Sequence, residues 1–166
     1  MEIKPLSKEA VPRALEKAER YRLLNEPAEA ESICLDVLRA DPENGEALVM
    51  LLLALTDQFD QEGRGALTLA RETLSRLRDG YSLAYYEGII WERWAKALLQ
   101  RSRPNTGFMA YEAFHKAMEL YAKAESIRPP GNDDALLRWN TCARILLHHP
   151  DLRPRGPEER SEPPLE

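Results

Sequence analysis

The fold is indicated most clearly by the stretch NEPAEAESICLDVLRADP, residues 25–42. Asn25 can adopt the left-handed backbone conformation that ends a helix, and Pro27 suits the first turn of the next one. Because a residue before proline is pushed out of the helical conformation, Asp41-Pro42 ends this second helix. Between these signals, apolar side chains recur at three- and four-residue steps, at Ala30, Ile33, Cys34, Val37 and Leu38. The stretch therefore predicts the end of one helix and the whole of another.

The same kinds of signal divide the rest of the chain. Apolar periodicity, caps and breakers predict seven helices, at about 10–24, 27–40, 44–60, 66–77, 82–101, 108–127 and 132–148. No segment alternates polar and apolar residues over a useful length, so we expect no sheet. The last residues are rich in proline and charge and cannot bury enough surface to fold alone. We expect an all-α domain over residues 1–149 and a disordered or extended tail over residues 150–166.

With Ala18 and Tyr21 upstream, the opening stretch resembles one unit of the tetratricopeptide repeat family. Small residues, Ala18 and Ala30, stand where the two helices of the family's unit cross, and Pro42 stands at its end. A degenerate second unit follows at about 45–78, and a longer third unit, at about 81–129, carries Gly88 and Ala117 at matching positions. The resemblance implies a right-handed superhelix of antiparallel helix pairs with about seven helices.

The last helix of such an array needs a polar outer face, because no further helix covers it. The segment 133–148 suits this role. We expect its apolar side chains to face inward, at Leu136, Trp139, Ala143 and Leu146. We expect its polar side chains to face solvent, at Arg138, Thr141 and Arg144.

In this family the first helix of each pair lines a concave groove that holds a peptide. The matching positions of this chain are Leu15, Glu19 and Arg22 in the first helix, Val49, Leu53 and Thr56 in the third, and Tyr85, Ile89 and Glu92 in the fifth. The resemblance therefore implies a largely apolar groove with a charged rim. Such a groove suits an amphipathic helix or an extended apolar peptide.

A clamp for a C-terminal carboxylate, known in this family, is not expected, because Leu15 and Glu19 stand where it would need Lys and Asn. Two alternatives to a peptide groove stay open. The apolar side chains could pack against one another or the last helix, or the groove could join two copies of the chain. The aromatic residues of the fifth and sixth helices form either a binding surface or the packing of a long two-helix arm. They are Trp91, Trp94, Phe108, Tyr111, Phe114 and Tyr121.

Composition disfavours several classes of function. The net charge is −5 and Lys and Arg are interspersed with Glu and Asp, so we expect no nucleic-acid-binding surface. The longest apolar block, residues 47–55, is too short to span a membrane. Cys34 and Cys142 lie on predicted amphipathic helices and are expected to be buried thiols. The spacing of histidines, cysteines and carboxylates suggests no metal site, cofactor or catalytic group.

We therefore expect a cytoplasmic, non-enzymatic adaptor or scaffold that binds a peptide or helix of a partner protein. Two alternatives remain. The first is a small tetratricopeptide chaperone that holds apolar client segments. The second is a structural subunit that associates with itself as a homodimer or within a larger assembly.

Overall fold

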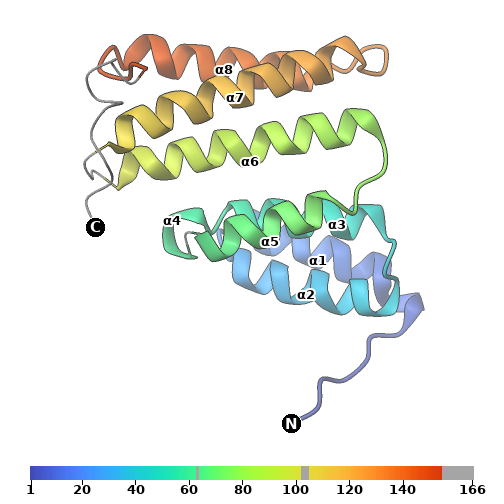
Figure 1. The fold of residues 1–166 in the computed structure, drawn as a ribbon. Coiled ribbons are helices and arrows are strands. Elements are labelled where there is room, and N and C mark those ends of the chain that lie inside the picture. The colour runs from blue at the N-terminus through green and yellow to red at the C-terminus, as the bar shows by residue number, and fades with distance from the viewer. Residues whose placement is uncertain (63, 102–104, 155–166) are drawn as a thin grey trace.

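The computed structural model describes residues 1–62, 64–101 and 105–154, and every regular element within these ranges is a helix (Figure 1). In chain order they are the 3-10 helix η1 (Lys8–Ala10), α1 (Val11–Leu23), α2 (Pro27–Ala40), α3 (Gly45–Thr56), α4 (Phe59–Glu62), α5 (Arg64–Leu74), α6 (Gly80–Gln100), α7 (Thr106–Ser126) and α8 (Asp134–His148). The predicted all-α class is confirmed.

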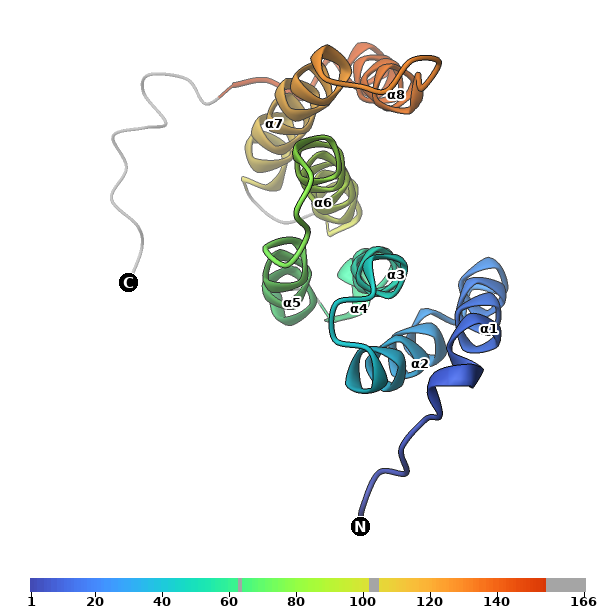
Figure 2. The same cartoon turned by 90° about the vertical axis from the view of Figure 1, so that its right-hand side faces the viewer.

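The helices follow one another in an arc, which is clearest along their axes in Figure 2. Helix α1 packs against α2, α2 against α3, α3 against α5, α5 against α6, α6 against α7, and α7 against α8. Helices α1, α3, α6 and α8 lie on the inner side of the arc, and α2, α5 and α7 lie on its outer side. Contacts of α3 with both α1 and α6 connect the inner row. We call the surface of α1, α3, α6 and α8 that faces the hollow of the arc the inner face.

Several helix ends lie where local signals place them. Asn25 has a φ of 60°, the left-handed conformation expected between the first two helices. The Asn44 side chain caps α3, since its Oδ1 accepts a hydrogen bond from the backbone N–H of Ala47 at 2.9 Å. Asp79 caps α6 in the same way, through the N–H of Ser82 at 2.8 Å. Short-range chemistry therefore determines where these helices start and stop.

The third predicted helix is divided in two, so the described residues contain eight α-helices where seven were predicted. Helix α3 ends at Thr56 and the short α4 begins at Phe59. The Thr56 hydroxyl donates to the carbonyl of Leu53 at 2.8 Å, and the Gln58 amide donates to that of Ala54 at 3.2 Å. The backbone N–H of Asp57 still bonds to Leu53, whereas that of Gln58 bonds to Leu55. The Gln58 side chain therefore replaces the helical bond to the Ala54 carbonyl, which stabilises the break.

Helices α6 and α7 pack closely where Gly88 of α6 meets Tyr121 of α7. A Cβ atom added at Gly88 would lie 2.6 Å from Cε1 of the Tyr121 ring, which is closer than such atoms normally approach. Ala117 and Ala124 of α7 are fully buried in the same core. Small residues at these positions let the two long helices pack closely along their length.

The predicted orientation of the last helix is confirmed for Arg144, which is exposed, and wrong for Arg138 and Trp139. Arg138, expected in solvent, turns inward and reaches the buried Glu92 of α6. Ala135 and Cys142 are the buried residues of α8, whereas Trp139, expected inside, is 37% exposed. Of the four apolar residues expected to face inward, Leu146 is the one that packs against the core. The buried carboxylate needs a cation, and this requirement sets the rotation of α8.

The aromatic residues of α6 and α7 pack largely inside the protein. Phe114 and Tyr121 are fully buried. The Trp94 ring meets the Phe59 ring edge to face, with centroids 6.0 Å apart. Part of the predicted tail is also docked: Leu152 is buried beside Gly107, and the Arg153 guanidinium lies over the Phe108 ring. The remainder of that predicted tail, residues 155–166, lies outside the described residues.

Candidate functional site on the inner face

The nine residues predicted to line a groove differ widely in their exposure. Glu19 is exposed, and the partly exposed members are Arg22, Val49, Leu53 and Tyr85. The buried members are Leu15, Thr56, Ile89 and Glu92. Leu15 and Ile89 belong to the hydrophobic core, which agrees with the alternative that apolar groove positions pack against one another. The first five residues are therefore the more accessible to a ligand that binds this structure without rearrangement.

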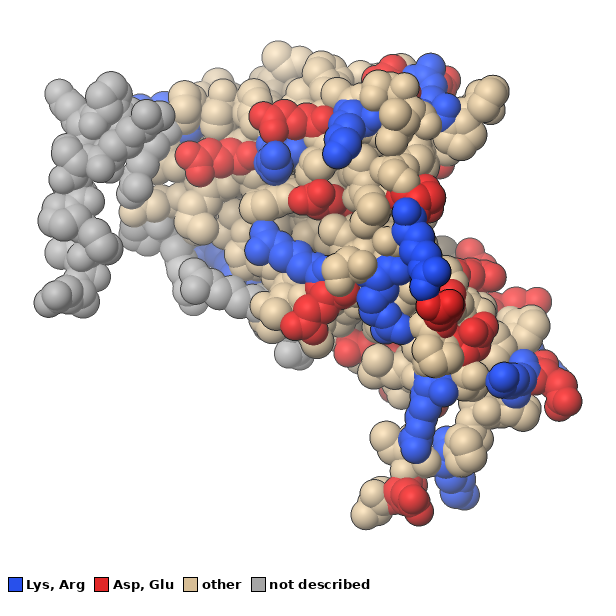
Figure 3. Space-filling model, turned by 45° about the vertical axis from the view of Figure 1, so that its right-hand side comes forward, with Lys and Arg blue, Asp and Glu red and all other residues tan. Residues whose placement is uncertain are grey.

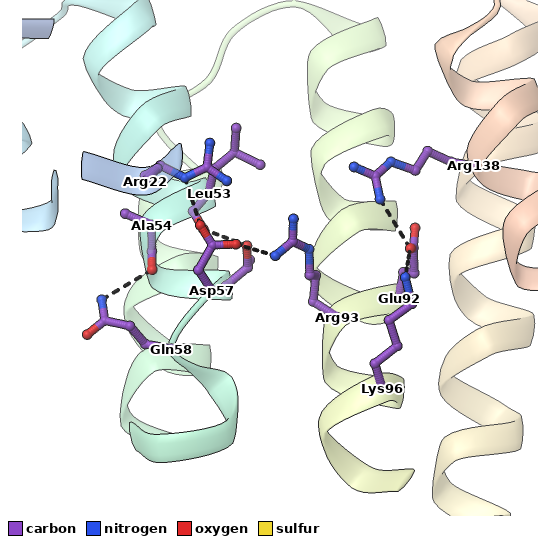
Figure 4. Close-up of polar contacts among 10 residues, drawn as sticks. Arg22, Leu53, Ala54, Asp57, Gln58, Glu92, Arg93, Lys96 and Arg138 are labelled. Atoms are coloured by element: carbon purple, nitrogen blue, oxygen red, sulfur yellow. Dashed lines mark hydrogen bonds and ion pairs between the residues drawn. The ribbon is translucent and has the colours of Figure 1, made fainter. Parts of the chain in front are cut away.

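Asp57, which follows α3 directly, connects three inner helices (Figure 4). Its Oδ2 accepts a hydrogen bond from Nε of Arg22 on α1 at 2.7 Å, and its Oδ1 accepts one from Nη1 of Arg93 on α6. A carboxylate at the C-terminal end of a helix faces the negative end of the helix dipole. The two guanidinium groups offset this unfavourable position and hold α1, α3 and α6 in register.

Glu92 makes a second and deeper cluster that connects α6 with α7 and α8. Its Oε2 accepts a hydrogen bond from the Tyr121 hydroxyl at 2.6 Å. Its Oε1 pairs with Nζ of Lys96 and, at 3.2 Å, with Nη1 of Arg138 (Figure 4). Each of the two helices that flank α6 here therefore contributes a donor to one buried carboxylate.

The partners of Glu92 keep it ionised. Burial acts to raise the pKa of Glu92 and is the largest influence on it. Hydrogen bonds from Lys96 and Tyr121, together with the charges of Lys96 and Arg138, outweigh burial and leave the pKa below its usual value. For Tyr121, burial and the adjacent Glu92 charge raise the pKa, so its hydroxyl remains a donor. The cluster is a stable ionic contact at neutral pH.

Two pockets lie beside these clusters. One of about 310 Å³ lies between α1, α3 and α6, and its lining includes Arg22, Thr56, Asp57, Arg93 and Lys96. The other, of about 350 Å³, lies between α6 and α8 and is lined by Tyr85, Asp134, Leu137, Arg138 and Thr141. Three of the predicted groove residues therefore border pockets on the inner face.

A cavity of about 910 Å³ lies at the end of the molecule where α3 and α6 begin. Val49 borders it, together with Arg76, Arg78 and Asp79. Arg76 donates to the carbonyl of Pro42 at 2.6 Å, so this side chain already has a partner. Positive and negative side chains lie next to one another on the face shown in Figure 3, and no large region of a single charge is visible there.

Sequence reasoning missed four of the residues that build the site: Asp57, Arg93, Lys96 and Arg138. A signal for two of them is present in the sequence. Glu92-Arg93 and Lys96 interrupt an otherwise apolar part of the fifth predicted helix. Charges at such positions need partners on neighbouring helices, because isolated buried charges are very costly. The pattern indicates that partners exist but does not say which residues they are.

The described part of the chain was also searched for metal ligands, reactive thiols and membrane-spanning helices. Within it, no group of three or more His, Cys, Asp or Glu side chains could hold a metal ion. Burial raises the pKa of both Cys34 and Cys142 to about 12, so both remain protonated thiols at neutral pH. No helix in these ranges is long and apolar enough to cross a membrane.

The chain matches no family model, no curated protein and no solved structure.

Proposed function

We propose that the protein is a cytoplasmic, non-enzymatic interaction scaffold, built as a tetratricopeptide-like right-handed superhelix, whose inner face binds a peptide or an amphipathic helix of a partner protein. The observation that carries this proposal is the position of the accessible groove residues. Glu19 and Arg22 on α1, Val49 and Leu53 on α3, and Tyr85 on α6 all come from the inner row of helices.

The chemistry of these residues suits a segment with an apolar side and a polar edge. Val49, Leu53 and Tyr85 are apolar or aromatic and partly exposed, while Glu19 and Arg22 supply charge on α1. Apolar anchors with polar groups at the rim are typical of helix and peptide recognition. The pocket between α6 and α8 could take one anchor side chain between Tyr85 and Leu137.

The two ionic clusters favour a surface that is already ordered before a ligand arrives. Asp57 connects α1, α3 and α6, and Glu92 connects α6, α7 and α8. A pre-organised surface loses less conformational entropy on binding and therefore binds more tightly for the same contacts. This supports a role for the inner face as a docking platform.

The proposal is tested by capturing partners from cells that produce the protein, with wild type and with a Leu53→Arg, Tyr85→Ala variant as bait. Leu35→Arg on α2 is the matched control, because Leu35 is exposed and lies on the outer row. We expect the inner-face variant to lose a partner that the control retains, with both variants folded by circular dichroism. The captured segment is then synthesised and its affinity measured by calorimetry.

A partner that binds both variants as tightly as wild type would rule out the inner face as its site. Capture of many unrelated apolar segments through this face, instead of one partner, would favour the chaperone alternative.

A further inference from the structure

The outward side of α8 carries an apolar stripe that nothing in the described structure covers completely. Leu147 is 80% exposed, and Leu136, Asn140 and Ala143 are partly exposed. The spacing of four, three and four residues puts all four on one side of a helix. We call these residues the α8 stripe. The side of α8 turned toward α6 and α7 carries different residues, at Ala135, Arg138 and Cys142.

Exposed apolar side chains extend to both flanks of the stripe. Trp139 on one flank is 37% exposed, and Leu137 on the other is 60% exposed. In stacked helical arrays the outer face of the last helix is normally polar, which keeps the protein soluble. A broad apolar face on α8 therefore indicates a contact with a further surface.

The rest of the chain offers little to cover this face. Residues 155–166, RGPEERSEPPLE, contain one large apolar side chain, Leu165. A segment of that composition buries too little apolar area to dock stably on a helix. The composition of residues 155–166 therefore gives no reason to expect that this segment covers the stripe.

We propose that the α8 stripe binds the α8 stripe of a second copy of the chain, with the two helices antiparallel about a twofold axis. A twofold interface requires that if residue i contacts residue j, then j also contacts i. The stripe meets this requirement, because its spacing of four, three and four is the same in both directions. Leu136 of one copy then faces Leu147 of the other, and Asn140 faces Ala143.

The sizes of the paired residues also match. The two leucine pairs lie at the ends of the contact, and the short Ala143 near its centre leaves space for the amide of Asn140. A single polar residue within an apolar helix pair is a known means of specifying register. Trp139 and its equivalent in the second copy lie on the same flank and cover the centre of the contact.

The charges along α8 favour the antiparallel orientation. Asp133 and Asp134 lie at its start, whereas Arg144 and His148 lie near its end. Antiparallel pairing sets the acidic start of one helix beside the basic end of the other and also aligns the two helix dipoles favourably. Asp133 already lies 3.3 Å from Arg128 within its own chain, while no ion pair of Arg144 is found among the described residues. A parallel pair would put like charges together at both ends.

Cysteine cross-linking tests the geometry directly. In a Leu136→Cys, Leu147→Cys variant the two introduced thiols lie about 16 Å apart within one chain, since they are eleven helical residues apart. A disulfide needs Cα atoms within about 7 Å, so a bond within the chain is impossible. The native Cys34 and Cys142 are buried, with pKa values of about 12, and should not react.

We expect mild oxidation to convert the double variant into a disulfide-linked dimer on a non-reducing gel. Each single variant should form no disulfide-linked dimer and should run as a monomer on the same gel. The reason is that the antiparallel pair separates equivalent residues by about 16 Å. Cross-linking of the single variants would show a parallel pair and overturn the proposal. Absence of cross-linking in the double variant would overturn it as well.

The reversible contact is measured by sedimentation velocity over a series of protein concentrations. We expect wild type to dimerise, and Leu147→Glu to weaken the dimer by at least about tenfold because it buries a charge in the contact. Leu23→Glu on α1 is the control, since Leu23 is 82% exposed and lies at the opposite end of the arc. Wild type that remains a monomer up to about 1 mM, or equal weakening by the two variants, would refute the contact.

Discussion

The two ionic clusters of this protein use the same design at different depths. Asp57 and Glu92 are each shared by two cations, and they lie on opposite sides of α6 (Figure 4). Asp57 contacts α6 through Arg93, whereas Glu92 extends from α6 itself. The Asp57 side chain is 18% exposed, whereas that of Glu92 is fully buried. Water therefore reaches the Asp57 carboxylate but not the Glu92 carboxylate, whose partners Lys96 and Arg138 are partly exposed. We therefore expect the same loss of a carboxylate to have very different consequences at the two sites.

The largest effect is expected for Glu92→Ala. This change leaves the fully buried Tyr121 hydroxyl and the partly buried Arg138 without this acceptor. Removing one partner of a buried pair costs about 3–5 kcal/mol. Urea unfolding followed by circular dichroism gives the free energy of unfolding. Glu87→Ala is the control on the same helix, because the described residues show no ion pair of Glu87. Equal losses in the two variants would contradict a special role of the buried cluster.

The second prediction concerns how the Glu92 cluster responds to acid. The pKa of Glu92 is lowered in the folded protein from its ordinary value of 4.5, so the ionised carboxylate stabilises the fold above that value. This contribution is lost as the pH falls through the lower, folded-state pKa. The difference in unfolding free energy between wild type and Glu92→Gln should therefore shrink between about pH 6 and about pH 2. A difference that is constant over this range would show that ionisation of Glu92 is not linked to stability.

A third change tests the packing that brings Tyr121 to Glu92. Gly88→Ala adds a Cβ atom 2.6 Å from the Tyr121 ring, and overpacking of this kind costs about 1–3 kcal/mol. Gly45→Ala is the matched control in α3, where an added Cβ would meet nothing within 4 Å. Thermal unfolding should show a lower midpoint for Gly88→Ala than for Gly45→Ala. Similar midpoints would mean that α6 and α7 separate easily at this contact.

The smallest effect is expected for Asp57→Asn. The change preserves the shape of the side chain but removes its charge, and ion pairs near the surface contribute about 1 kcal/mol or less. The loss of unfolding free energy caused by Asp57→Asn should be smaller still at about 1 M salt than at about 0.1 M, because salt screens exposed charges. The loss of unfolding free energy caused by Glu92→Ala should change little between the two salt concentrations. Equal salt dependence at both sites would remove the distinction between a screened and a buried cluster.

Interactions between residues close in the sequence were sufficient to predict most of the helices and their ends. Asn25, Asn44 and the dipeptide Asp41-Pro42 each act within a few residues, so their effects can be read from the sequence. The break after Thr56 was missed because Thr56 and Gln58 bond to backbone carbonyls, and this competes with a strongly apolar helical pattern. Five predicted groove residues remain accessible, but burial of the other four depends on how closely the inner helices pack.

The sequence alone determined that this chain is helical and where most helices begin and end, because hydrogen bonds and backbone preferences act over a few residues. Only the tertiary structure decided which side of each helix faces inward. Helix α8 has apolar residues on more than one side, so its periodicity permits more than one rotation. The choice came from Glu92, more than forty positions away along the chain, whose buried charge draws Arg138 inward and leaves Trp139 partly exposed. A pairing between distant charges depends on packing, and local periodicity contains no information about it.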